Sequence, residues 1–498
     1  MSFKFLVLTD PHFFDTDLGC SGSAYEDFMH YEQKCFAETE SINNAVFKYL
    51  GETDLADTVI IVGDLTQNGE RKSHEKFIKL LYDIKAKGKK VYLITADHDW
   101  KNDPFAFGEN GRYMPEPTPK EDLIKLYNDF GFADAIAVDE EHLSYVAQLS
   151  ENVRLLAINA DIKTKGQFSL TEKQVEWIKV QTKKAREENQ TMFAICHYPV
   201  LPIQPLFSII KSALMYDYKS VATLLADEGV HLVFTGHMHN QSINEFVTEK
   251  GNKFFDVTTG SIIADPSYMR LVTLNEDKAE IESIPTPDFD YDTKGMTCKE
   301  YLTSVFDAMI RNILLDLRDD TTRAMRKFHI KESKGLVFAL RMAGKLLCSV
   351  KLGTLAKLLF IKCDKSIRKV KLIDYATVLV RNVFRGNQTY NEGTPEGDVF
   401  IAFLKRLKPI LKKISVKDPY GEKVDLAELL KNTAGNYGYD HYNTEITWLE
   451  VWLPLTRELS ATQTEGEISR AVKPISPSVF ALRQIHLPRQ REVLFVFF

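Results

Sequence analysis

The stretch Phe5-Leu6-Val7-Leu8-Thr9-Asp10-Pro11-His12 opens the chain with a short apolar run that ends in a carboxylate and an imidazole. The four apolar residues predict a buried β-strand. Side chains alternate in an extended chain, so Asp10 and His12 project to the same side and can share one ligand. Aspartate with histidine suits a divalent metal. Taken alone, the tripeptide Asp-x-His also fits a turn aspartate beside a half-buried histidine.

The same arrangement recurs four more times in the N-terminal half of the chain. Apolar runs beginning at residues 59, 91, 193 and 232 each end in residue types that bind metals. These residues are Gly63-Asp64, Ala96-Asp97-His98-Asp99, Cys196-His197 and Gly236-His237-Met238-His239. Open α/β sheets place their binding sites outside the carboxyl ends of the strands. We therefore expect five strand ends to converge on one crevice.

Length and composition set the broad class of the protein. A chain of 498 residues is too long for one ordinary core and predicts two or three domains. The net charge of -6 favours neither a nucleic-acid nor an acidic partner, and no specific nucleic-acid motif is present. The six cysteines form no Cys-x-x-Cys pair, which indicates free thiols in a reducing compartment. Without a recognisable signal peptide or spanning segment, we expect a cytoplasmic protein.

Alternating strand and helix patterns predict a first domain over residues 1–284. Its helices are expected over residues 32–50, 120–130, 171–188 and 219–228, with Ser169 and Glu172 as a capping box for the third. Residues 285–300 begin with two prolines and an acidic, turn-prone segment, which predicts a linker. Helical periodicity then predicts a mainly α-helical C-terminal domain over residues 301–498, whose tail from about residue 469 gives no clear pattern.

The C-terminal domain contains a basic stretch at residues 323–371. Fourteen Lys or Arg residues stand there against two acidic residues, with leucine, valine and phenylalanine interleaved. One interpretation is an amphipathic helix that lies on an anionic membrane surface or a polyanion. The other is a core helix whose lysines extend outward into solvent.

Taken in order, the five strand-end motifs resemble the motif series of the calcineurin-like metallophosphoesterases. The resemblance covers about residues 1–275 and includes bacterial phosphodiesterase-type members. It implies an α/β fold in which two mixed β-sheets form a sandwich flanked by helices, in an αββα arrangement. It also implies a dinuclear metal centre at one edge of that sandwich.

Carried over position by position, the resemblance implies seven metal ligands. Asp10, His12 and His239 would hold one ion, Asp97, His197 and His237 the other, and Asp64 would bridge both. Carboxylate and imidazole ligands together suit Mn, Fe, Zn or Co. Two such ions can support in-line attack of a bridging hydroxide on a phosphoester.

His98 directly follows a predicted ligand, and we assign it to catalysis without metal ligation. At this position an imidazolium can stabilise developing charge or protonate the departing oxygen.

The family's third motif usually reads Gly-Asn-His, whereas this chain has Ala96-Asp97-His98. The extra carboxylate of Asp97 should weaken the pull of the metals on bound water, and Ala96 lacks the backbone freedom of glycine. Tyr198 stands where many relatives carry a second histidine, and it either faces the substrate or packs.

The function predicted from these residues is metal-dependent hydrolysis of a phosphoester, with a phosphodiester mildly preferred over a phosphomonoester. The substrate would be a small phosphoester or a nucleotide, and loops 13–26 and 101–119 are expected to set specificity. The alternative is a catalytically weak or inactive binding protein that keeps the phosphoesterase fold and acts through its basic helical region.

Overall fold

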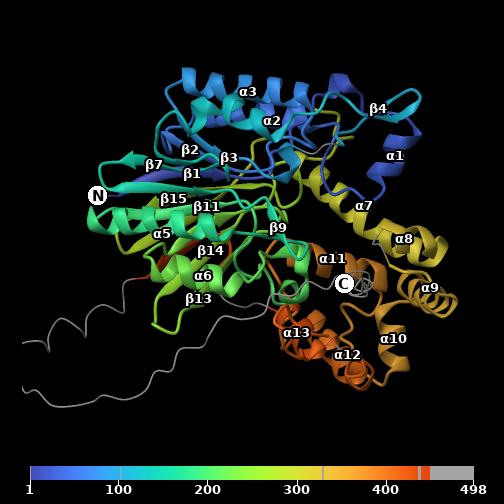
Figure 1. The fold of residues 1–498 in the computed structure, drawn as a ribbon. Helices are drawn as coiled ribbons and strands as arrows, with labels where there is room; N and C mark the ends of the chain where they lie inside the picture. Colours follow the sequence, from blue (N-terminus) through green and yellow to red (C-terminus); the bar gives the residue numbers. More distant parts are fainter. Residues whose placement is uncertain (1, 101–102, 328–329, 415, 436–438, 449–498) are drawn as a thin grey trace, which may run out of the picture.

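The computed structural model describes residues 2–100, 103–327, 330–414, 416–435 and 439–448. Two large mixed β-sheets lie face to face, and helices cover both outer faces (Figure 1). The predicted αββα sandwich is therefore confirmed. The last residues of the chain, including the tail from about residue 469, lie outside the described residues.

The first sheet has the strand order β17-β16-β15-β1-β2-β3. Its strands are β1 (Phe3–Leu8), β2 (Thr58–Val62), β3 (Lys90–Ile94), β15 (Tyr268–Leu274), β16 (Lys278–Pro285) and β17 (Thr444–Thr447). β1, β2 and β3 run parallel, so their carboxyl ends meet at one edge. β17 comes from the C-terminal region and was not predicted from the sequence.

The second sheet has the strand order β13-β14-β12-β11-β8-β7-β6. Its strands are β6 (Ala135–Asp139), β7 (Ser144–Ser150), β8 (Val153–Ile158), β11 (Thr191–Cys196), β12 (Leu232–Thr235), β13 (Ser242–Val247) and β14 (Lys253–Thr258). β8, β11, β12 and β14 are parallel neighbours. Every residue of β8 and β12 is buried, as expected for strands covered on both faces.

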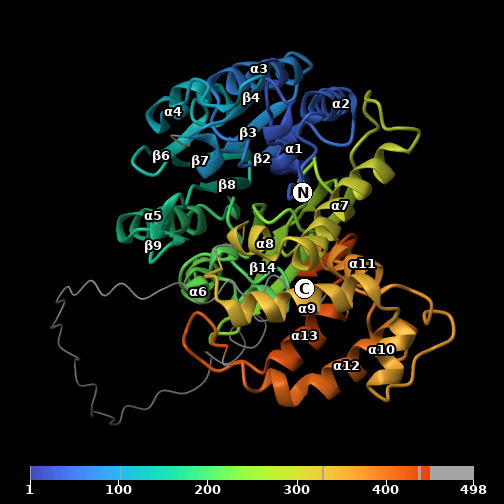
Figure 2. The ribbon, with the colours of Figure 1, turned by 90° about the vertical axis from the view of Figure 1, so that its right-hand side faces the viewer.

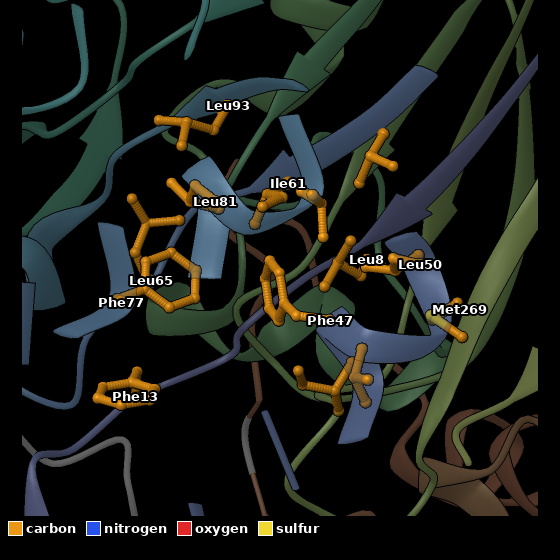
Figure 3. Close-up of a cluster of buried hydrophobic side chains, with 14 of the residues drawn as sticks. Leu8, Phe13, Phe47, Leu50, Ile61, Leu65, Phe77, Leu81, Leu93 and Met269 are labelled. Atoms are coloured by element: carbon orange, nitrogen blue, oxygen red, sulfur yellow. The ribbon is translucent and has the colours of Figure 1, made fainter. Parts of the chain in front are cut away.

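Helices α2 (Thr39–Glu52) and α3 (Arg71–Ala86) cover the outer face of the first sheet, and α5 (Glu172–Glu187) and α6 (Tyr218–Asp227) cover that of the second. Figure 3 shows Phe47 of α2 beside Leu8 of β1, with Phe77 of α3 and Ile61 of β2 in the same buried cluster. A separate apolar layer, which includes Phe5, fills the space between the sheets. This packing fixes the strands whose ends carry the predicted site.

Four local predictions need correction. The helix expected over residues 120–130 is interrupted, since only α4 (Leu123–Leu126) is α-helical there. α2 begins at Thr39 instead of residue 32, because residues 30–38 form a connection whose Cys35 N–H donates to the Ile263 carbonyl. The cap of α5 is Thr171, whose hydroxyl accepts from the Gln174 N–H, and not Ser169. The segments predicted as loops contain short elements: α1 (Ser23–Met29), β4 (Ala106–Gly108) and β5 (Gly111–Tyr113).

The C-terminal region is mainly helical, as predicted. Its helices are α7 (Cys298–Asp319), α8 (Thr321–Lys327), α9 (Lys334–Ser349), α10 (Leu352–Leu358), α11 (Leu372–Phe384), α12 (Pro395–Leu411) and α13 (Leu426–Ala434). Short elements α4 (Leu123–Leu126), β9 (Ile162–Thr164) and β10 (Gln167–Ser169) complete the described strands and α-helices. The described helices include none that is both long enough and apolar enough to span a bilayer.

Candidate metal centre

The predicted site residues follow the carboxyl ends of strands from both sheets. Asp10 follows β1 and Asp64 follows β2, which are parallel neighbours in the first sheet. His197 follows β11 and His237 follows β12, which are parallel neighbours in the second. Both pairs of strands end at the same edge of the sandwich, and this edge gathers the polar side chains.

Left-handed backbone is concentrated at these strand ends. Five of the eight predicted site residues have a positive φ: Asp10 (51°), His12 (39°), Asp64 (50°), His237 (70°) and His239 (54°). Residues other than glycine rarely adopt this conformation, and such strain collects at functional sites. The backbone of these turns is therefore strained, and it directs several side chains toward one point.

Two glycines provide the close approach that the site requires. A Cβ atom on Gly63, whose φ is 77°, would lie 2.6 Å from Nδ1 of His197. A Cβ atom on Gly236 would lie 2.4 Å from Oδ2 of Asp10. Both positions exclude any larger residue unless a site residue moves.

The first triad consists of Asp10, His12 and His239. Nε2 of His239 lies 3.1 Å from Nε2 of His12 and 3.2 Å from Oδ1 of Asp10. Donor atoms bound at about 2.1 Å to one ion are separated by roughly 3.0–3.5 Å. The triad is buried, and its atoms already have the spacing of metal ligands.

The second triad consists of Asp64, His197 and His237, whose ligand atoms lie within 4.8 Å of one another. Nε2 of His197 lies 3.1 Å from Oδ2 of Asp64. The same carboxylate oxygen lies 3.5 Å from Nε2 of His12, which belongs to the first triad. Asp64, a member of the second triad, therefore also lies close to the first triad.

Several buried polar atoms at this edge have no hydrogen-bond partner within the described residues. They include Oδ1 of Asp64, Oδ1 of Asp97 and Nδ1 of His237. Burying a polar atom without a partner costs free energy, so such atoms are rare unless a ligand completes them. Divalent cations fit both the donor types and the unpaired atoms.

The ionisation of Asp64 suits a cationic ligand, whereas His197 would have to release its proton to bind one. Burial by itself raises the pKa of Asp64, but the imidazoles of His197 and His98 outweigh it and hold that pKa well below its usual value. Burial also lowers the pKa of His197, yet Asp64 and Asp10 raise it to about 10. The carboxylate of Asp64 therefore stays ionised, the state that binds cations.

Asp97 is brought to the same edge but is in none of the three metal-capable groups found among the described residues. Its N–H donates to Oη of Tyr198, whose hydroxyl donates to Asp161. Nζ of Lys163 lies 3.8 Å from Oδ2 of Asp97. Tyr198 is buried and stacks on Phe168, so it packs and positions Asp97.

Two further residues complete the third strand end. Ala96 has extended backbone with φ -138°, a conformation that does not require glycine. Nδ1 of His98 lies 2.7 Å from the Gln67 carbonyl and donates to it. This bond fixes the ring and directs Nε2 away from the backbone. His98 also falls within 4.8 Å of His12 and Asp64 as a third metal-capable group.

Two residues that support the site were not predicted from the sequence. Asp99 accepts from the N–H groups of Thr66 and Ala96, so it joins two of the strand-end turns. Its position beside Asp97 and His98 was a usable signal. The side-chain amide of Gln33 lies 2.6 Å from Nδ1 of His239, and nothing in the sequence around Gln33 indicates that contact.

Comparison with known proteins finds a family model that matches part of the chain. Residues 3–241 match the family model described as calcineurin-like phosphoesterase. The chain is 24% identical over 313 residues to an uncharacterized metallophosphoesterase-like protein of Bacillus subtilis, covering 57% of this chain and 59% of that protein. It is 25% identical over 234 residues to a probable glycerophosphodiester phosphodiesterase of Arcobacter nitrofigilis, covering 46% of this chain and 70% of that protein.

Among solved structures, a dimetal phosphatase from Danio rerio matches with a TM-score of 0.42 and 14% identity, covering 57% of this chain and 96% of that one. A purple acid phosphatase from yellow lupin matches with a TM-score of 0.38 and 15% identity, covering 59% of this chain and 53% of that one. The chain spans less than two thirds of the Bacillus subtilis relative.

Proposed function

We propose that this protein is a metal-dependent phosphohydrolase, because residues 3–241 match the family model described as calcineurin-like phosphoesterase. The observation that carries the proposal is the meeting of two Asp/His triads at one edge of the sandwich, with Asp64 within reach of both. We assign the catalytic unit to residues 1–284, with residues 285–300 as the connection to the helical C-terminal domain over residues 301–498.

The first triad would hold one divalent ion, and the second triad would hold the other with Asp97. Asp64 would bridge the two. When bound, the cations supply Lewis-acid chemistry that polarises the phosphoryl group and activates water. The mixture of carboxylates and imidazoles favours Mn, Fe, Zn or Co over Ca.

His98 is assigned to proton transfer and charge stabilisation. Its Nδ1–H is used by the Gln67 carbonyl, so Nε2 is the atom that meets the phosphoryl oxygens or the leaving oxygen. Asp99 holds the turn that carries His98, because its carboxylate accepts the Ala96 N–H at 2.8 Å. The ring therefore needs little reorganisation during the reaction.

A phosphodiester is preferred as the substrate class for an electrostatic reason. Asp97 adds a carboxylate to a site that already holds Asp10 and Asp64. A diester carries one negative charge and a monoester up to two, so the extra carboxylate disfavours the monoester more strongly. The name of the Arcobacter nitrofigilis relative, a probable glycerophosphodiester phosphodiesterase, supports the same preference.

The test is a hydrolysis assay on the purified full chain, combined with metal analysis. We expect Mn-dependent turnover, faster on bis-p-nitrophenyl phosphate than on p-nitrophenyl phosphate, and its loss on chelation. A glycerophosphodiester and a nucleotide diester should be included as physiological classes. Bound metal without turnover on any of these esters would refute the proposal and favour the binding-protein alternative.

A further inference from the structure

Large exposed apolar side chains are concentrated in the helical C-terminal region. Of nineteen such side chains among the described residues, eight fall within residues 334–363 and 405–414. They are Phe338, Met342, Leu346, Leu358, Phe360, Leu407, Ile410 and Ile414. Phe360 is 87% exposed and Phe338 67%, values that are costly for rings without a partner. We call residues 334–363 and 405–414 the basic-apolar surface.

The same two segments are strongly cationic. Together they carry eleven Lys or Arg residues and no Asp or Glu. Within the part of the chain that the structure describes, only Lys408 of these eleven forms an ion pair, with Asp425 at 3.8 Å. The remaining positive charges are therefore free to meet an external anionic surface.

The geometry of α9 shows how charge and apolar surface are combined. Phe338, Met342 and Leu346 recur every four residues and so form one stripe along the helix. The opposite side is packed, because a Cβ atom on Gly344 would lie 2.5 Å from the backbone of α7. α9 is thus held by its inner face, while none of the described residues covers the stripe on its outer face.

α10 and α12 lie next to each other at the second part of the surface. Nη2 of Arg406 on α12 lies 3.5 Å from the carbonyl of Phe360, which follows α10. Leu407 and Ile410 belong to the same helix end as Arg406. In Figure 2, α9, α10 and α12 occupy the lower part of the molecule, on the side away from α2 and α3.

We propose that the basic-apolar surface docks this protein onto the anionic face of a lipid bilayer. A polyanion such as RNA would pair with the lysines but would leave the leucines, isoleucines and phenylalanines in water. A bilayer interface satisfies both, since anionic headgroups meet the cations while apolar side chains enter the acyl boundary. This inference does not depend on the proposed hydrolase activity.

The test is flotation of the full chain with vesicles of phosphatidylcholine alone and of three parts phosphatidylcholine to one part phosphatidylglycerol. We expect partition onto the anionic vesicles only, weakening as salt screens the cations. Lys345→Gln/Lys412→Gln should lower partition by about fivefold for each cation removed. Phe338→Ser/Phe360→Ser should lower it by more than tenfold.

Matched controls lie on other exposed faces of the molecule. Lys72→Gln/Lys79→Gln on α3 removes two exposed cations, and Val180→Ser/Val247→Ser removes two apolar side chains that are 50% and 51% exposed. Neither control should change partition. Hydrolysis of a soluble phosphodiester and the melting temperature should be unchanged in all four variants, which separates docking from folding and from catalysis.

Three outcomes would overturn the proposal. The first is failure of the full chain to float with anionic vesicles. The second is full retention of binding by Phe338→Ser/Phe360→Ser, which would indicate charge alone and a polyanion partner. The third is flotation with anionic vesicles only after Phe495→Ser/Phe497→Ser. That result would mean that a segment of this chain, and not a bilayer, occupies the surface in the unmodified protein.

Discussion

The strand ends and the helical C-terminal region place their charges in opposite ways. Asp10, His12 and Asp64 are buried, close to charged partners and held on left-handed backbone. The lysines of α9 and α12 are exposed and carried by regular helix, and most of them have no ion-pair partner among the described residues. Burial makes each charge at the strand ends strongly dependent on its neighbours, whereas solvent isolates those on the helices. Substitutions should therefore have large effects at the strand ends and small effects on the helices.

The largest effect is expected for Asp64→Asn. Asp64 is within reach of both triads, so its neutralisation should lower metal content and reduce kcat/KM on the order of 1,000-fold. The measurements are metal analysis and hydrolysis of bis-p-nitrophenyl phosphate. Asp256→Asn is the matched control, because Asp256 is also buried but accepts from the N–H groups of Val200 and Leu201. Equal metal loss in both variants would refute the bridging role.

His98→Asn should reduce kcat on the order of 100-fold while leaving metal content unchanged. The asparagine amide can still donate to the Gln67 carbonyl, but it cannot transfer a proton. His231→Asn provides the control, since His231 donates from Nδ1 to the Lys253 carbonyl in a comparable way and lies at the other end of β12 from His237. If His98→Asn instead loses metal, His98 is a ligand and the catalytic assignment is wrong.

Gly63→Ala and Gly88→Ala separate backbone strain from steric conflict. Both glycines have a positive φ, 77° and 90°, but a Cβ atom on Gly88 meets nothing within 4 Å. Gly88→Ala should lower the free energy of unfolding by about 1 kcal/mol. Gly63→Ala should cost a further ~2 kcal/mol, because its Cβ atom displaces His197. Denaturant unfolding of both variants measures the difference, and equal losses would contradict it.

How much of this could be predicted from the sequence depends on the range of the interaction. Each strand-end motif is local, so the strands, the αββα sandwich and the candidate ligands follow from runs of apolar residues, their end residues and the family resemblance. The start of α2 and strand β17 could not be predicted, because both are set by distant partners. Cys35 is held by the Ile263 carbonyl, and β17 pairs with β16 from more than 150 residues away.

The same limit applies to the site. Gln33 lies 206 positions from His239 in the sequence, and no local pattern indicates that the two side chains meet. The basic stretch was visible as a charge imbalance, but its two interpretations could not be separated without knowing which apolar side chains are exposed. The structure leaves Phe338 and Phe360 in solvent and buries Leu340.

Gln33→Leu should lower metal affinity about tenfold, since partners of metal-binding histidines commonly contribute 10- to 100-fold. The connection that carries Gln33 is held by α7, where Asp316 contacts His30 at 2.9 Å and Asn312 donates to the His30 carbonyl. Asp316→Asn should therefore reproduce a weaker form of the same loss, a few-fold in metal affinity. Metal titration of both variants is the measurement, and an unchanged affinity in Gln33→Leu would break this link between the two regions.

The smallest expected effect is a gain. Asp97→Asn removes a negative charge beside the triads, so turnover at neutral pH should rise by a few-fold while metal content stays intact. Lys163, 3.8 Å from Oδ2 of Asp97, partly offsets that charge, so Lys163→Gln should lower turnover slightly. Because Lys163 is half exposed, solvent screens the pair and keeps the effect small. In the double variant the Lys163 substitution should have no further effect, since its partner charge is gone. Additive effects, or metal loss in Asp97→Asn, would show that Asp97 acts mainly as a ligand and not through its charge.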